Sequence, residues 1–341
     1  MSAKAPTRLG IAAMCKSMSE YLEWIDVAEA CGYDLAGYGD TQNLLPDAYV
    51  ALAAMASRTS RIKLCTTVSN PVTRHPSVAA SGFAALQQLS EGRAIFGIGT
   101  GDSAVKNMGG RAATVDQIAD YCRAFRDLVH GRTTTYDDHP MRLLWDAPSV
   151  PLYLAAEGPR MMRLAGEVAD GVIFGNGISR EVVQANLAAV RDAAAAAGRD
   201  PDTVEPWFLT KVVLSDEPEH DLWTRLAWTL AASANHAFLF TFEGKHVPPE
   251  LEDPLRRLMA GYRSHEHNQV DTPGHNAALV NDNGLTEFLG RRFLIGGTAE
   301  HVAARIRELG EWGATNLLFT AMWGDPIGYT RRIAAEVMPL L

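Results

Sequence analysis

Three carboxylates stand where short apolar runs of the sequence give way to small and polar residues. Asp40, Asp102 and Glu157 each occupy such a place. A carboxylate there can cap a helix, or it can move a proton or bind a cofactor. Residue type alone leaves both roles open for Asp40 and Asp102, and we predict that one or both act as the local acid or base.

A possible phosphate site follows from the stretch Glu157-Gly158-Pro159, which precedes a helical pattern at residues 160–169. The first N–H groups of a helix are unpaired and lie at the positive end of its dipole, so they can hold a phosphate. Gly-Pro can equally do no more than begin a helix. Residues 97–101 carry glycine at alternate positions but lack the spacing of a dinucleotide motif.

The residues that follow the apolar runs, here called the rim, are small, rich in glycine and mostly uncharged. They offer no basic partner for a nucleophile and no paired acids or His-x-His for a metal. Exposed backbone N–H groups and close backbone approach suit a large flat cofactor with an anionic tail. Besides the three carboxylates, the rim comprises Thr67, Val68, Ser69, Asn70, Thr100, Gly101, Ser103, Ala156, Gly158, Pro159, Asn176, Gly177, Trp323 and Gly324.

Alternating strand and helix patterns must position this rim. Residues 62–68, 76–89 and 94–98 predict a βαβ unit, whose two strands are parallel. Eight such strands, each followed by a helix, favour an α/β fold of the (β/α)8 TIM-barrel type. A doubly wound open sheet is the alternative, but no G-x-G-x-x-G opens the first helix. The strands are expected at residues 9–14, 33–39, 62–68, 94–98, 151–156, 172–175, 207–214 and 316–322.

Two segments interrupt the alternation. Residues 133–150 have no clean period and suggest a hairpin, and residues 220–290 form an insertion before the last strand. The insertion is too long for a plain connection, so we expect a cap over the active face. Its histidines His265, His267 and His275 could suggest a metal site, but a solvated loop explains them better, and we predict no metal.

Composition predicts a globular protein in a single domain spanning residues 1–341. Of its 341 residues, 47% are hydrophobic and 21% are charged. A formal net charge of −9 argues against nucleic acid or an anionic membrane as a partner. The four cysteines form no CxxC pair, and the sequence has neither a leader nor an apolar run long enough to span a membrane. We therefore expect a cytoplasmic protein.

Residues 66–105, TTVSNPVTRHPSVAASGFAALQQLSEGRAIFGIGTGDSAV, resemble the luciferase-like oxidoreductase superfamily. The likeness is to the branch that resembles F420-dependent methylenetetrahydromethanopterin reductase. Residues 152–175 (LYLAAEGPRMMRLAGEVADGVIFG) and 33–56 (YDLAGYGDTQNLLPDAYVALAAMA) resemble the same family. The three segments cover about a third of the chain in the family's order.

The resemblance implies a barrel that binds FMN or the 5-deazaflavin coenzyme F420 at its carboxyl face. It implies a cis peptide bond between Thr67 and Val68, in a bulge behind the ring of the cofactor. Asp40 and the loop of Thr100, Gly101 and Asp102 would face the reacting side. The resemblance also implies that Asn70 binds the cofactor. The phosphate of the cofactor would be held by Ala156, Glu157, Gly158 and Pro159.

The choice of cofactor decides the chemistry. F420 transfers hydride, whereas reduced FMN can also activate oxygen, and the Gly-Thr-Gly-Asp-Ser turn resembles the F420 branch. We therefore expect an F420-dependent reductase or dehydrogenase. The alternatives are an FMN-dependent monooxygenase for a small apolar or aromatic substrate and a non-catalytic flavin-binding barrel. Sugar-phosphate dehydrogenases of this branch have His where this chain has Thr41 and Glu in place of Asp102, which argues against that substrate.

The expected partners are a small organic substrate and, by family resemblance, a second copy of the chain in a homodimer. The insertion contains Trp223, Trp228, Phe238, Phe240, Phe242 and Tyr262. These side chains would suit an apolar or aromatic substrate, but core packing explains them at least as well.

Overall fold

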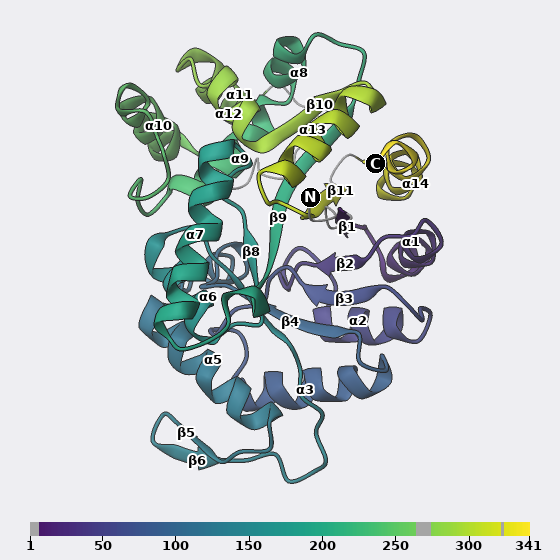
Figure 1. The fold of residues 1–341 in the computed structure, drawn as a ribbon, viewed down its shortest axis with the longest axis vertical. Coiled ribbons are helices and arrows are strands. Elements are labelled where there is room, and N and C mark those ends of the chain that lie inside the picture. Colours follow the sequence, from purple (N-terminus) through teal and green to yellow (C-terminus); the bar gives the residue numbers. More distant parts are fainter. Residues whose placement is uncertain (1–6, 264–273, 322–323) are drawn as a thin grey trace.

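A closed ring of parallel strands forms the centre of the protein (Figure 1). The structure is a computed structural model that describes residues 7–263, 274–321 and 324–341. Each strand of the ring pairs in parallel with the next, and the last pairs with the first. In ring order, the strands are β1 (Arg8–Ala13), β2 (Leu35–Tyr38), β3 (Lys63–Thr66), β4 (Ala94–Ile98), β7 (Leu152–Ala155), β8 (Gly171–Phe174), β9 (Glu205–Leu214) and β11 (Asn316–Ala321).

This ring confirms the predicted (β/α)8 barrel and excludes the open sheet. An open sheet would leave two edge strands with one neighbour each. Here every ring strand has two neighbours, because β8 pairs with β9 and β1 pairs with β11 from Arg8 with Asn316 to Ala13 with Ala321. The predicted strand at residues 94–98 has the bounds of β4. The other predicted bounds differ at the ends of the strands.

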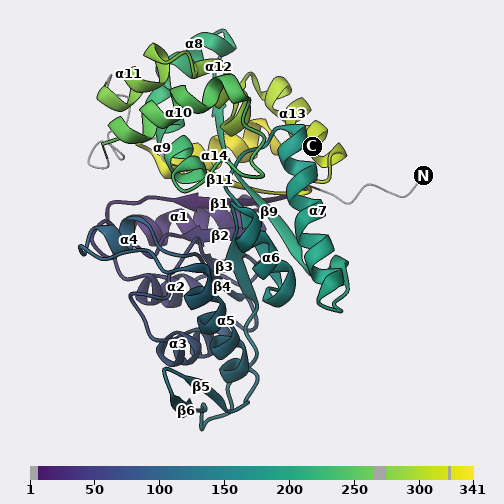
Figure 2. The ribbon, with the colours of Figure 1, turned by 90° about the vertical axis from the view of Figure 1, so that its left-hand side faces the viewer.

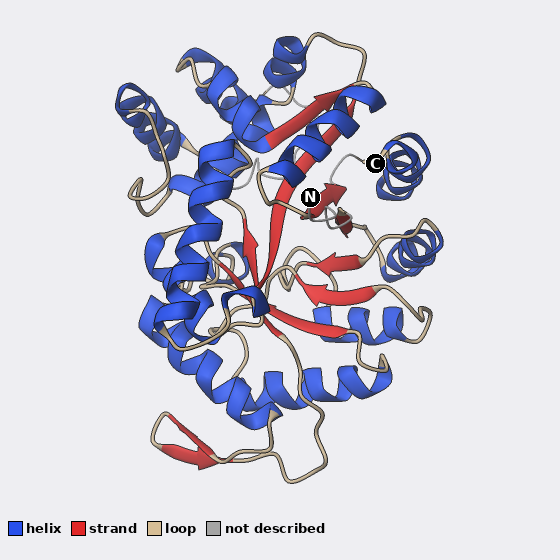
Figure 3. Ribbon diagram, viewed as in Figure 1, coloured by secondary structure: helices blue, strands red, loops and turns tan. Residues whose placement is uncertain are grey.

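Helices surround the ring (Figure 3). Side chains cap several of them: Ser17, Asp47 and Thr298 each accept a hydrogen bond from the first turn, and Thr114 forms a capping box with Gln117. The helices are α1 (Met18–Ala30), α2 (Ala48–Ala56), α3 (Pro76–Leu89), α4 (Ser103–Lys106), α5 (Val115–Val129), α6 (Pro159–Val168), α7 (Arg180–Ala196), α13 (Ala299–Glu311) and α14 (Pro326–Glu336). The short helix α4 was not predicted.

The interior of the barrel changes in character along the strands. Large side chains fill it near the amino ends of the strands, where Leu35, Ile95 and Trp207 belong to one buried cluster. Two residues further along, β2 and β4 carry glycines. A Cβ atom at Gly97 would lie 2.0 Å from the carbonyl oxygen of Thr66, so the two backbones approach closely there. The strands thus present mostly backbone at their carboxyl ends.

The segment between β9 and β11 forms a helical insertion with a core of its own. It contains α8 (Glu219–Arg225), α9 (Ala227–Phe238), α10 (Pro249–Gly261), α11 (His275–Asp282) and α12 (Thr286–Phe293). A further strand, β10 (Leu294–Gly297), pairs with β9 outside the ring and was not predicted. Figures 1 and 2 show the insertion helices at one end of the molecule.

A hairpin lies at the opposite end of the molecule (Figures 1 and 2). Strands β5 (Thr134–Tyr136) and β6 (His139–Met141) pair antiparallel, which confirms the interpretation of residues 133–150. Among the described residues, no helix is long and apolar enough to cross a membrane.

The aromatic residues of the insertion mostly support its own core. Trp223, Trp228 and Phe238 are buried there, and Phe242 and Tyr262 pack against them. Phe240 differs, because 73% of its surface is exposed. Core packing therefore explains these aromatics, and they give no support to an apolar substrate. Of the histidines and rim residues considered above, His265, His267 and Trp323 lie outside the described residues.

Candidate active site

A bulge after β3 forms the first part of the site. The peptide bond between Thr67 and Val68 is cis, as predicted from the family resemblance. The chain then runs beside β4, since the N–H of Ser69 donates to the carbonyl of Gly97 at 2.8 Å and the N–H of Gly99 donates to that of Ser69 at 2.9 Å. Two rim segments far apart in sequence are thereby fixed side by side at the carboxyl ends of the strands.

Asn70 lies in this bulge and is almost fully buried. Its side-chain oxygen accepts hydrogen bonds from the N–H groups of Val72 at 3.0 Å and Thr73 at 2.9 Å. Its side-chain nitrogen is buried and has no partner among the described residues. A buried donor without a partner is costly and points to a group that the protein binds.

Asp40 follows β2 and is also buried. It accepts a hydrogen bond of 2.6 Å from the hydroxyl of Ser69, and Arg74 lies 3.8 Å from the same oxygen. Burial raises the pKa of Asp40 above its ordinary value, although both neighbours favour the charged form. Arg74 is shared, because it donates to Asp47 at 2.6 Å. Asp40 therefore sits within a network that includes the predicted bulge.

The loop after β4 turns sharply before it places Asp102. Gly101 has φ of +96°, and a Cβ atom there would lie 2.7 Å from Val105 and 3.3 Å from Asn70. Thus this loop also contacts the bulge after β3. Asp102 stands at the N-cap of α4 but makes no capping hydrogen bond. The capping interpretation of Asp102 is therefore wrong.

Asp102 instead binds two cationic side chains. Lys106 on α4 forms an ion pair with it, and His236 Nδ1 on α9 lies 3.0 Å from its Oδ2 atom. Burial alone would raise the pKa of Asp102, but the hydrogen bond and charge of His236, together with Lys106, hold it well below its ordinary value. Asp102 is therefore ionised at neutral pH.

The pKa of His236 is shifted in the opposite direction to that of Asp102. Burial among protein groups would lower its pKa, but the hydrogen bond to Asp102 and the charges of Asp102 and Glu157 raise the pKa above its ordinary value. The side chain still keeps 41% of its surface accessible. Sequence reasoning noticed His236 only as one of several histidines, because nothing local predicts its contact with Asp102.

The residues predicted to bind phosphate follow the end of β7 and begin α6. Gly158 is the N-cap of α6 and makes no side-chain capping bond, and nothing lies within 4 Å of a Cβ atom built on it. The N–H of Ala156 already donates to the carbonyl of Ile173 at 3.0 Å, and Pro159 has no N–H. Within the predicted phosphate site, the backbone N–H groups of Glu157 and Gly158 therefore remain as candidate donors, together with those of the first turn of α6.

Further charged residues surround Glu157 and were missed by sequence reasoning. Burial raises the pKa of Glu157, although the charges of His236 and Lys245 oppose the shift. On β9, Lys211 donates a hydrogen bond to Ser233 on α9, and burial lowers the pKa of Lys211 to about 8. The two lysines are distant in sequence, so only the closed fold could show that both act on one group of charges.

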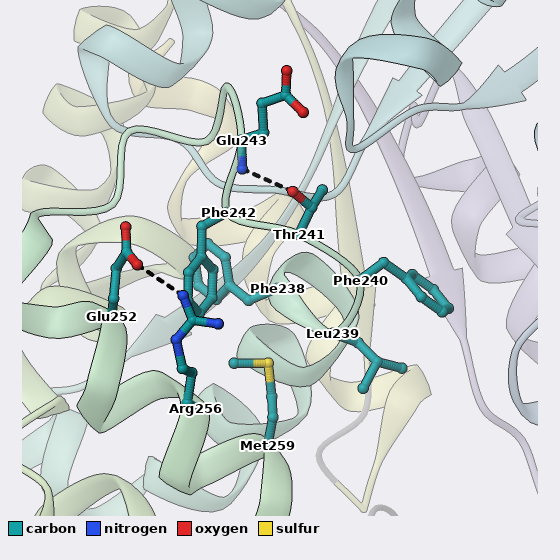
Figure 4. A pocket seen from close by; sticks show the side chains of 9 residues that line it. All are labelled: Phe238, Leu239, Phe240, Thr241, Phe242, Glu243, Glu252, Arg256 and Met259. Carbon is teal, nitrogen blue, oxygen red and sulfur yellow. Dashed lines mark hydrogen bonds and ion pairs between the residues drawn. The ribbon is translucent and has the colours of Figure 1, made fainter.

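A separate cavity of about 500 Å³ lies within the insertion (Figure 4). It is formed by the end of α9, the following loop and α10. None of the predicted site residues lines it, and Arg256 in its wall is already bound to Glu252 at 2.9 Å. We therefore place the active site at the strand ends and not in this cavity.

Three features lie on one face of the parallel barrel: the cis peptide bond after β3, the glycines near the strand ends, and the start of α6, which no side chain caps. Against known families, the model described as "Luciferase-like monooxygenase" matches residues 2–316. The chain belongs to this family. That finding confirms the predicted family and, with the relatives described next, the prediction of an oxidoreductase.

Individual members of the family extend this result. The chain is 35% identical over 326 residues to 5,10-methylenetetrahydromethanopterin reductase of Methanolobus tindarius, covering 92% of each protein. It is 25% identical over 361 residues to F420-dependent glucose-6-phosphate dehydrogenase of Mycobacterium avium, covering 99% of this chain and 98% of the relative.

Solved structures show the same fold. The F420-dependent tetrahydromethanopterin reductase of Methanopyrus kandleri superposes with a TM-score of 0.74 at 23% identity, over 98% of this chain and 99% of that one. A long-chain alkane monooxygenase gives a TM-score of 0.71 at 17% identity, over 99% of this chain and 91% of that one.

Proposed function

We propose that this luciferase-like oxidoreductase transfers hydride between F420 and a small organic substrate. The observation that carries the proposal is the 35% identity, over nearly the full length of both chains, to a methylenetetrahydromethanopterin reductase. A second relative that matches nearly end to end is described as F420-dependent. Bound F420 supplies the hydride, and the protein supplies binding, orientation and proton transfer.

The described residues fit such a cofactor. The bulge at Thr67 and Val68 would lie against its ring, and the partnerless side-chain nitrogen of Asn70 offers a hydrogen-bond donor within the same bulge. The N-terminus of α6 at Gly158 would hold the phosphate, because its N–H groups are unpaired and no side chain caps it. Thr100, Gly101 and Asp102 would form the wall beside the bulge, facing the reacting side of the cofactor.

The carboxylates are proposed to have different roles. Asp40 is buried beneath Ser69 and would hold the bulge in place and shield the cofactor from water. Asp102 is ionised and would act on its partner His236, so it is not the acid at neutral pH. Glu157 lies beside the proposed phosphate site, where its charge would act on His236 and Lys245.

A sugar phosphate is not the proposed substrate, despite the relatives described as glucose-6-phosphate dehydrogenases. Thr41 takes the place of their histidine, and its hydroxyl lies 3.3 Å from that of Ser103. The two lysines of the site do not form an open clamp, since Lys211 binds Ser233 and Lys245 binds the carbonyl of Ala237. We propose instead a substrate with a reducible C=O or C=N bond.

An FMN-dependent monooxygenase is the second candidate. The family description and the fold shared with a long-chain alkane monooxygenase favour it. The two candidates differ in their need for oxygen, because reduced FMN can activate oxygen and reduced F420 does not. In line with family resemblance, we further propose a homodimer.

The test is an anaerobic assay with reduced F420 and a panel of ketones and imines. Return of the visible absorbance of oxidised F420, dependent on both protein and substrate, is expected. The same panel with reduced FMN and an oxygen electrode tests the second candidate. Oxygen uptake that requires protein and substrate, with no oxidation of F420, would overturn the proposal in favour of the monooxygenase.

A further inference from the structure

We propose that His236 on the insertion helix α9 is the acid–base residue of the substrate reaction and that Asp102 orients it. The inference rests on the proposed hydride transfer and assigns a chemical role to the insertion. Hydride transfer to a C=O or C=N bond also needs a proton at the heteroatom, so a proton donor must lie at the carboxyl ends of the strands.

Geometry singles out His236 from the other candidates. Its Nδ1 atom lies 3.0 Å from Asp102, and the side chain keeps 41% of its surface accessible. A carboxylate at Nδ1 fixes the orientation of an imidazole and stabilises its protonated form. Asp40, by contrast, has 4% of its surface exposed and binds the hydroxyl of Ser69, so a substrate cannot readily reach it.

Charged groups from several elements face the imidazole. Asp102 and Glu157 are the negative ones, and they follow β4 and β7. Lys211 on β9 is positive, and Lys106 on α4 shares the carboxylate of Asp102. The effect of the two negative charges exceeds that of burial and of Lys211, so the pKa of His236 is raised above its ordinary value. The protonated form of the imidazole is therefore favoured over that of a free histidine, whereas Asp102 is held in its ionised form.

The proposed step balances in both directions. During reduction, the substrate carbon gains a hydride from reduced F420 and the heteroatom gains a proton from His236, so the C=O or C=N bond becomes a single bond. The imidazole then takes a proton from solvent. During oxidation, it accepts the proton of the alcohol or amine as the hydride leaves the carbon.

The first measurement uses the cofactor-free protein. Nitrogen-15 NMR of histidine side chains should give a titration midpoint for His236 above the ordinary value of about 6.5. In Asp102→Asn this midpoint should fall by about one pH unit or more, because an opposing charge in contact is removed. An unchanged midpoint would overturn the claim that Asp102 acts through His236.

The second measurement compares His236→Asn with His220→Asn, a control on helix α8 of the same insertion. His236→Asn should bind F420 within about twofold of the wild type, because its role is at the substrate. Its rate of hydride transfer should fall by about 100-fold or more and lose the wild-type dependence on pH. His220→Asn should match the wild type in all three measurements.

The outcomes separate the two proposals. F420 binding and a full rate in His236→Asn would overturn this inference and leave the proposed function intact. Failure of the wild type to bind F420 would overturn the proposed function and this inference together. Circular dichroism checks that His236→Asn is folded. If this variant is unfolded, His236→Gln is used in the same assays instead.

Discussion

At the scale of single residues, the aspartates that follow β2 and β4, the strands on either side of β3, have opposite pKa shifts. Asp40 is buried, with Arg74 3.8 Å away, and its pKa is raised. Asp102 contacts Lys106 and His236, and its pKa is lowered. Both were predicted from the sequence as acid–base candidates. Local residue types could not distinguish them, because the deciding partner His236 comes from the insertion.

The pair of Asp102 and His236 predicts how stability depends on pH. Asp102 has a lowered pKa in the folded state, so its contribution is present above about pH 4 and is lost as pH falls through the folded value. His236 has a raised pKa, so its contribution is present below about pH 6.5 and is lost as pH rises through the folded value. The pair therefore stabilises the fold most between these limits.

Asp102→Asn should accordingly lower the free energy of unfolding by about 1 kcal/mol near pH 5.5 and by less near pH 8.5. Urea unfolding at both pH values measures the difference. Asp116→Asn serves as control, because Asp116 pairs with Arg160 at the surface and is 87% exposed. An equal loss at both pH values for Asp102→Asn would show that His236 is not its titrating partner.

At the scale of elements, the regular part of the fold follows from the sequence. Apolar runs predicted the eight barrel strands, because most of their consecutive residues are buried. Helical periodicity predicted the helices between them, because each buries one face. Strand β10 was missed because its four residues Leu294–Gly297 follow a helix directly and contain two glycines. The contacts of the insertion with the barrel were also beyond prediction, because they depend on buried polar groups far apart in sequence.

Arg292 forms a buried polar link between the insertion and the barrel. The side chain is buried on α12, and its Nε atom donates to the carbonyl of Asn176 at 2.8 Å while Nη2 donates to that of Lys245 at 2.7 Å. Burial lowers the pKa of Arg292 to about 10, so it remains charged at neutral pH. Its guanidinium also lies 5.0 Å from the ring centre of Phe238.

Arg292→Met should therefore destabilise the protein by about 2–4 kcal/mol, since buried carbonyls lose their donors. The neighbouring Arg291 provides the control, because it is exposed and pairs with Glu287 on the same helix. Arg291→Met should cost less than about 1 kcal/mol. Urea unfolding of the two variants measures the difference in stability. Similar losses in the free energy of unfolding would contradict the proposed role of Arg292 as an anchor.

The start of helix α6 predicts an effect on binding without an effect on folding. A Cβ atom at Gly158 would meet no protein atom within 4 Å, and the backbone there is extended. Gly158→Val should therefore unfold like the wild type but bind F420 about tenfold or more weakly, because the valine crowds the phosphate. Gly158→Ala should show a smaller effect. Unchanged affinity in fluorescence titrations of both would mean that Gly158 only begins a helix.

At the scale of the whole molecule, the barrel brings together residues that are far apart in the sequence. The bulge after β3, the loop after β4 and the start of α6 meet at the carboxyl ends of the strands, as the closed barrel predicts. The insertion then adds His236 to this face. Family resemblance predicted where a cofactor would lie, but the three-dimensional structure was needed to identify His236 as the proposed proton-transfer group.

The central claim is that this face binds F420 in preference to FMN. Calorimetric titration of the purified protein with each cofactor tests it most directly. We predict a dissociation constant for F420 below about 100 μM, that is, a binding free energy stronger than about −5.5 kcal/mol, and weaker binding of FMN. Tighter binding of FMN, or binding of neither below that concentration, would contradict the account.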